Sequence, residues 1–184
     1  MAVYNIFDST NMRSTHYGER IFDAVATEDI ENGTFGYLDG LATGEKHIYN
    51  FKKGTKEGEL IVVADNPAWN EDTSRLGNQA RDKYIIPAGT AFRVRVVKVT
   101  DEFATAIEGV TAASQSAMAV GAFVTIDATT GKLVAAAQKP NAGALVGEVM
   151  RTRDLGSVVV TTARTYGRAK TMYTVKVLSL AVQS

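Results

Sequence analysis

Short runs of apolar and β-branched residues alternate with turn-forming residues along most of this chain. A period of about two residues, which is typical of half-buried strands, is clearest in residues 91–100. This alternation predicts that Arg93, Arg95 and Lys98 face outward from a strand. The other runs that predict strands are at residues 20–26, 47–51, 59–64, 84–90, 144–150, 156–162 and 172–178.

Residues 122–137 contain a complete β-hairpin pattern. Phe123–Ile126 is rich in aromatic and β-branched residues, Asp127–Gly131 consists of turn formers, and the chain becomes apolar again from Leu133. The Asp127 side chain can accept bonds from its own turn, and Gly131 can adopt a positive φ without steric cost. The pattern therefore predicts two paired strands joined by this turn, whose tip faces solvent or touches a neighbour.

The spacing of these elements predicts the fold class. Glycines at 40, 44, 54 and 58 separate short strand-like runs, and long segments with a 3.6-residue period are almost absent. We therefore expect an all-β, or β-dominated, small barrel or sandwich of about nine or ten short strands, with at most one or two short helices. Residues 21–184 form this β-rich domain, and the sequence leaves open a division into two modules at about 21–110 and 111–184.

The first twenty residues are mainly polar and show no sustained period, which indicates an extended amino-terminal arm over residues 1–20. Tyr4, Phe7 and Tyr17 are scattered aromatics within it. Because an isolated arm of this kind would fray, we expect it to dock, either on its own domain or on a partner.

Composition narrows the classes of function. The chain has 184 residues, with twenty basic residues balanced by twenty acidic ones, so net charge does not favour nucleic acid or an anionic membrane as a partner. Cysteine is absent, which excludes disulfides and thiolate chemistry. No basic segment followed by an apolar core begins the chain, and no run of eighteen apolar residues occurs. We expect a soluble protein made in the cytoplasm.

The residues that usually perform chemistry are sparse. The two histidines, His16 and His47, show no paired spacing typical of a metal site. Thr129–Lys132 resembles the end of a phosphate-binding loop, but Ile126 stands where that loop needs glycine. Adjacent carboxylates such as Asp101 and Glu102 are expected to be solvated charges at a turn. We therefore expect no enzyme, no cofactor and no metal site.

One acidic cluster leaves two interpretations open. In the sequence, Asp65, Glu71, Asp72 and Asp82 lie on either side of Trp69, the only tryptophan, which would suit a site for a cation or a sugar with an aromatic platform. Arginines and a lysine are interspersed among them, so a solvated loop paired with itself explains the same pattern.

Two blocks of the sequence resemble a known family. Met118–Val134, followed by Ala144–Met150, resembles the small β-barrel of tailed-bacteriophage head decoration (capsid cement) proteins. The shared phrase is a strand ending in Asp, a turn with Gly-Lys, a second strand, and then a Val-Gly-x-Val strand. The opening of the chain, Tyr4–Asn11 with Thr15–Arg20, also resembles phage structural proteins found near major capsid genes.

This resemblance implies a virion structural protein that binds the outer surface of a capsid and stabilises contacts between neighbouring capsomers. The implied partners are the major capsid protein and further copies of this chain, most often as a trimer. On this basis we expect the arm to make part of the contact. The residues expected to do so are Tyr4, Phe7, Asn11, Arg13, His16 and Tyr17.

Two alternatives remain open at this stage. The first is a host-surface or carbohydrate-binding module displayed on the virion, with Trp69 as its platform. The second is a tail or baseplate structural protein with similar β architecture. Both would give a cysteine-free, β-rich chain of this kind, so composition alone does not separate them from a capsid protein.

Overall fold

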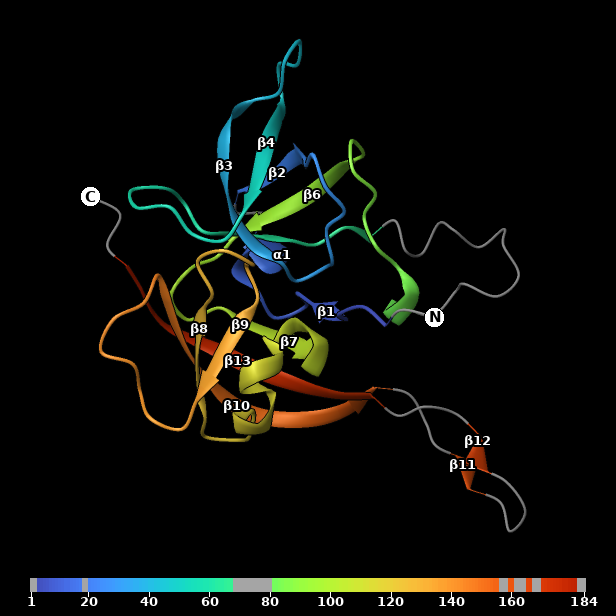
Figure 1. Ribbon diagram of the computed structural model, residues 1–184, viewed down its shortest axis with the longest axis vertical. Coiled ribbons are helices and arrows are strands. Elements are labelled where there is room, and N and C mark those ends of the chain that lie inside the picture. Colours follow the sequence, from blue (N-terminus) through green and yellow to red (C-terminus); the bar gives the residue numbers. More distant parts are fainter. Residues whose placement is uncertain are drawn as a thin grey trace.

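A closed β-barrel forms one half of the molecule in the computed structural model, which describes residues 3–17, 20–67, 81–155, 159–160, 165–166 and 170–181 (Figure 1). Around the barrel the strand order is β2-β4-β3-β5-β6, and β6 pairs with β2 to close it. Only the β2–β4 pair is parallel. The barrel strands are β2 (Ile21–Val25), β3 (Phe35–Leu41), β4 (Ile48–Lys53), β5 (Val62–Ala64) and β6 (Ala91–Val96).

An antiparallel six-stranded sheet forms the other half, in the order β1-β7-β13-β10-β8-β9. It combines the amino-terminal strand with strands from the second half of the chain. Its members are β1 (Phe7–Asp8), β7 (Glu102–Ala106), β8 (Phe123–Ile126), β9 (Leu133–Ala136), β10 (Leu145–Leu155) and β13 (Lys170–Leu180). A small separate sheet pairs β11 (Val159–Val160) with β12 (Thr165–Tyr166).

Helical structure is limited to short pieces in the described part of the chain. One α-helix, α1 (Arg13–Tyr17), follows β1, and three 3-10 turns occur later. The 3-10 turns are η2 (Arg81–Lys83), η3 (Ile107–Gly109) and η4 (Ala112–Ala117). The predicted all-β class is confirmed, with eleven strands in the two main sheets, slightly more than the sequence indicates. Residues 84–90 contribute only an isolated bridge between Ile86 and Ile30 instead of the predicted strand.

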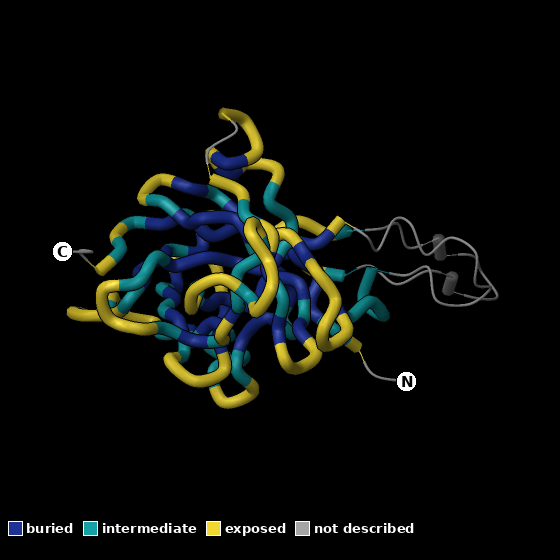
Figure 2. The backbone as a smooth tube through the Cα atoms, turned by 90° about the horizontal axis from the view of Figure 1, so that it is seen from above, coloured by how far each residue is buried: buried dark blue, intermediate teal, exposed yellow. Residues whose placement is uncertain are grey.

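One hydrophobic core joins the two halves. Phe35 and Val63 from the barrel pack in the same buried cluster as Phe103 and Leu145 from the six-stranded sheet. Phe35 and Phe103 are in direct ring contact, with centroids 5.4 Å apart. A second cluster fills the barrel itself. Buried segments therefore run through the centre of the molecule, while the loops around it are exposed (Figure 2).

The predicted hairpin is confirmed, and its tip docks on the barrel. The Asp127 Oδ1 atom accepts the backbone N–H groups of Thr129 and Thr130 at 3.1 and 2.7 Å, and Gly131 has a φ of 67°. The Gly131 carbonyl then accepts the Phe35 N–H at 2.8 Å. Residues 128–130 at the tip are exposed, which is the first of the two alternatives, while the backbone of the turn bonds to the chain's own barrel.

The prediction that Arg95 faces solvent is wrong. Strand alternation does direct Arg95 out of the barrel, but that outer wall is covered by the amino-terminal segment, so the side chain is buried. Its Nε atom pairs with Asp65 at 2.5 Å, and the same carboxylate oxygen accepts the Ser9 hydroxyl at 2.6 Å. Arg93 is exposed, as the alternation predicts, and Lys98 is half-exposed.

Candidate interaction surface

The amino-terminal segment is built into the fold through Asn5. The Asn5 amide donates to the Asn32 carbonyl at 2.8 Å, and its side-chain oxygen accepts the Thr105 hydroxyl at 3.0 Å and the Ala106 N–H at 3.2 Å. Its backbone N–H donates to Glu31 at 3.0 Å. One buried side chain therefore links the barrel to β7. The sequence leaves open whether the arm docks on its own domain or on a partner. In the structure the arm docks on its own domain.

Two glycines provide the space that Asn5 occupies. A Cβ atom added to Gly33 would collide with the Asn5 amide and would lie 2.9 Å from the Phe7 ring. A Cβ atom added to Gly109 would reach the same amide at 2.6 Å. Gly33 also has a φ of 83°, which side chains with a Cβ rarely adopt. These glycines are structural requirements for docking the segment.

Charged groups hold the next part of the segment. Asp8 pairs with Arg153 on β10, and the Arg81 guanidinium donates to the Phe7 carbonyl at 2.9 Å. Burial acts to raise the pKa of Asp8, but hydrogen bonds from Thr10 and the hydrogen bond and charge of Arg153 outweigh it and hold that pKa below its usual value. Burial also lowers the pKa of Arg81, against the raising effect of Asp8. The segment is fixed by ionised groups as well as by packing.

Helix α1 presents three of the predicted contact residues on one face. Arg13, His16 and Tyr17 are spaced i, i+3 and i+4, which places their side chains on the same side of a helix, and all three are exposed. The Tyr17 side chain is the most open of them, with 77% of the residue exposed. Met12 and Ser14 are buried beneath them. The segment thus has a buried anchor and an exposed polar and aromatic face.

Asp101 fixes the start of this helix. Its Oδ1 atom accepts the Arg13 N–H at 2.9 Å and its Oδ2 atom accepts the Lys98 N–H at 2.8 Å, and the residue is fully buried. The expectation that Asp101 is a solvated turn charge is therefore wrong, because two backbone donors satisfy the carboxylate inside the protein. The role of Asp101 depends on a contact with the distant residue 13, so the sequence pattern around position 101 contains no signal for it.

The turn that contains Asp101 also carries an exposed apolar side chain and a strained backbone. Val99 is 43% exposed, and the next residue, Thr100, has a φ of 76°. A β-branched residue in this region of the backbone is a true outlier, which costs about 1–3 kcal/mol. We define the α1 face as Arg13, His16, Tyr17 and Val99.

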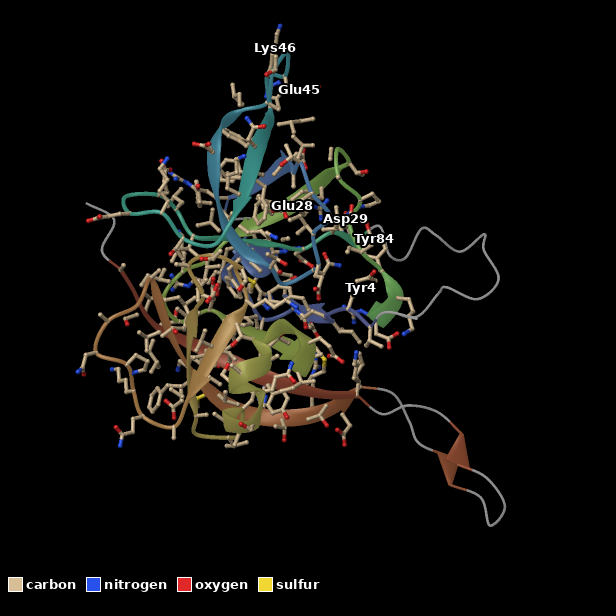
Figure 3. The ribbon with its side chains drawn as sticks, in the orientation of Figure 1. Tyr4, Glu28, Asp29, Glu45, Lys46 and Tyr84 are labelled. Atoms are coloured by element: carbon tan, nitrogen blue, oxygen red, sulfur yellow. The ribbon has the colours of Figure 1, made fainter. Side chains whose placement is uncertain are left out.

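The six predicted contact residues therefore separate into three groups. Asn11, Arg13, His16 and Tyr17 are exposed, whereas Phe7 is buried in the core and presents no surface to a partner. Tyr4 is half-buried and lies at the margin of the molecule, in the same region of the view as Tyr84 (Figure 3). Its N–H donates to the Asp82 carbonyl at 2.8 Å. Trp69 lies outside the described residues.

Two other kinds of feature are absent from the described residues. No group of three or more His, Cys, Asp or Glu side chains in that part of the chain could hold a metal ion. None of its helices is both long and apolar enough to cross a bilayer.

The chain was also compared with known proteins. No protein-family model matches it, and neither a curated protein nor a solved structure does.

Proposed function

We propose that this chain is a structural protein of a phage virion that binds the outer surface of the capsid and stabilises contacts between neighbouring capsomers. The major capsid protein is its partner, and the resemblance of Met118–Val134 to head decoration proteins favours assembly as a trimer. In this proposal the protein is not an enzyme and uses no cofactor. The protein binds at many equivalent positions of one capsid lattice.

The observation that carries the proposal is the α1 face on its buried anchor. Asn5, Asp8 and Asp101 hold the amino-terminal segment in one conformation, so α1 loses little further entropy when it meets a partner. Exposed tyrosine and arginine are the residue types that contribute most to binding energy at protein interfaces. Tyr17 and Arg13 lie side by side on this surface.

The test is to add purified protein to capsids that lack it and to count bound copies per shell. We expect binding to saturate when the number of bound copies per shell equals the number of equivalent positions of one kind on the capsid lattice. Tyr17→Ala should weaken binding by about tenfold or more, since a central interface tyrosine contributes roughly 1–2 kcal/mol. The matched control is Leu41→Ala, because Leu41 is also exposed, to 48%, and ends β3, the strand whose hairpin with β4 extends away from α1 (Figure 1).

The control variant should bind as wild type does, and both variants should unfold at the wild-type temperature because both side chains are exposed. If wild-type protein fails to bind shells that do bind a control decoration protein, the proposal is wrong. If Tyr17→Ala binds shells as tightly as wild type does, α1 is not part of the contact.

A further inference from the structure

Strand β10 has an open edge over its second half. Its eleven residues pair with β13 on one side as far as Leu155. On the other side, β8 pairs only with Gly147 and Glu148, and the last backbone bonds there join Val149 to Gly121 and Ala122. In the part of the chain that the structure describes, residues 151–155 have no strand on that side. β10 runs along the lower margin of the molecule in Figure 1.

The open edge presents a short template for another strand. Residues 150–154 are exposed, and five residues of strand span roughly 17 Å. Unpaired backbone N–H and C=O groups along such an edge pair readily with an added strand. Where the edge begins, two exposed apolar residues adjoin the bonded Gly121–Val149 pair: Val120, 60% exposed, and Met150, 46% exposed.

A second copy of β10 fits this edge poorly. Two antiparallel copies of a strand can be related by a two-fold axis perpendicular to the sheet, and directly opposed residues then lie on the same face. Because side chains alternate between the faces, an odd-numbered residue is opposed by an odd-numbered one and an even-numbered residue by an even-numbered one. Arg151 and Arg153 lie on one face, as their pairing with Thr174 and Met172 on β13 shows. Every such register centred on one of the residues 150–154 places arginine opposite or diagonal to arginine, and like charges at these positions are destabilising.

An acidic strand would meet complementary charge at the same positions. Arg151 approaches Glu102 at 3.8 Å and Arg153 pairs with Asp8, yet their side chains are 61% and 49% exposed. A guanidinium has five N–H donors, so one carboxylate partner leaves donors for another. Carboxylates at alternate positions of an incoming strand would lie beside these two arginines.

We propose that the open edge of β10, residues 150–155, binds an extended segment of the capsid protein as an added strand, with acidic residues beside Arg151 and Arg153 and an apolar residue against Val120 and Met150. This inference rests on the proposed function and adds a second contact, on the six-stranded sheet, to that of the α1 face. Two contacts on one particle raise the occupancy beyond what either contact gives alone.

Hydrogen exchange on wild-type protein bound to shells tests the inference directly. In the free protein, the amides on the open side of residues 151–155 should exchange rapidly. On shells, they should slow by at least tenfold, because an added strand gives them acceptors. Bound protein whose amides in this range exchange as in the free state would refute the inference and leave the proposed function standing. If wild-type protein does not bind shells, both the inference and the proposed function are wrong.

A charge reversal provides the second measurement. Arg151→Glu should weaken binding to shells by roughly threefold to tenfold, because the reversal removes an opposed charge pair and adds repulsion. The matched control, Lys46→Glu, makes the same change in net charge at an exposed position of the loop between β3 and β4 (Figure 3). Equal weakening by both variants would indicate a general charge effect and contradict the inference. Protection of 151–155 that depends on protein concentration without shells would identify a second copy as the occupant, and would also overturn it.

Discussion

The Asp101 carboxylate accepts the backbone N–H of Arg13 at 2.9 Å, across 88 positions of sequence. Through its other oxygen it accepts the Lys98 N–H at 2.8 Å. A single buried side chain therefore orients both components of the α1 face, the helix and the turn that carries Val99. The geometry of this surface is determined in the core rather than by the exposed residues themselves.

Replacing Asp101 should consequently affect stability and binding together. Asp101→Ala leaves two backbone donors without an acceptor, and each such buried group costs about 1–3 kcal/mol. We expect the free energy of unfolding to fall by about 2–4 kcal/mol in urea titrations. Asp101→Asn, which keeps one acceptor oxygen, should lose less. Equal stability of Asp101→Ala and wild type would show that these bonds contribute little.

A pair of glycine substitutions tests the docking of the amino-terminal segment. Gly33→Ala should be strongly destabilising, by more than about 3 kcal/mol, because the new Cβ atom displaces Asn5 and Phe7 in addition to occupying a positive φ. Gly44 has nearly the same φ, 82°, and open space around it. Gly44→Ala should therefore cost only about 1 kcal/mol. Similar losses for both variants, measured by chemical denaturation, would mean that Asn5 and Phe7 can move aside cheaply.

Local sequence signals predicted the parts of this fold that local interactions determine. The 122–137 hairpin has its predicted strands because the Asp127 side chain and the positive φ of Gly131 form the turn within the hairpin itself. The same signals do not predict the burial of Arg95 and Asp101, because this burial depends on a segment more than eighty residues away in sequence. Periodicity reports which face a side chain occupies, but it does not report what covers that face.

The candidate surface shows the same division. The polar and aromatic composition of residues 11–17 is visible in the sequence, and four of the six predicted contact residues are exposed. Phe7 resembles its neighbours in composition, but it pairs with Thr105 and packs against the Phe103 ring at 5.5 Å. Its burial follows from joining the edge of a sheet made of later strands. Deleting the whole arm would therefore remove part of the core, so point substitutions are the better test of binding.

The ion pair of Asp8 predicts a dependence of stability on acid. Its pKa is lowered in the folded state, so the ionised carboxylate stabilises the fold above the unfolded-state value, and this contribution is lost as the pH falls through the lower folded-state value. Asp8→Asn should reduce stability at neutral pH by about 1 kcal/mol, a modest amount because the pair is partly solvated. The difference from wild type should shrink as the pH falls from about 4 toward 2.

Asp23 provides the control for net charge, since it is exposed on β2. Asp23→Asn removes the same charge, so a change in the acid branch that both variants share, followed by urea titration at a series of pH values, would be an effect of net charge. A constant difference between Asp8→Asn and wild type over the whole acid range would show that the ionised form of Asp8 is not the stabilising one.

Thr100 gives the last prediction, because its φ of 76° is unfavourable for a β-branched residue. Its N–H donates to the Val177 carbonyl at 2.9 Å, so the turn between β6 and β7 maintains the strained conformation through its pairing with β13. Thr100→Asn should raise the free energy of unfolding by about 0.5–1 kcal/mol, since asparagine tolerates the left-handed region far better. Thr90→Asn is the matched control: Thr90 is also an exposed turn threonine, but its φ is not positive, so the change should give no gain. Val99, which belongs to the α1 face, precedes the strained residue. If the turn keeps its shape, Thr100→Asn should bind shells as tightly as wild type does. A gain in stability accompanied by a loss of binding would show that the strain itself positions the α1 face.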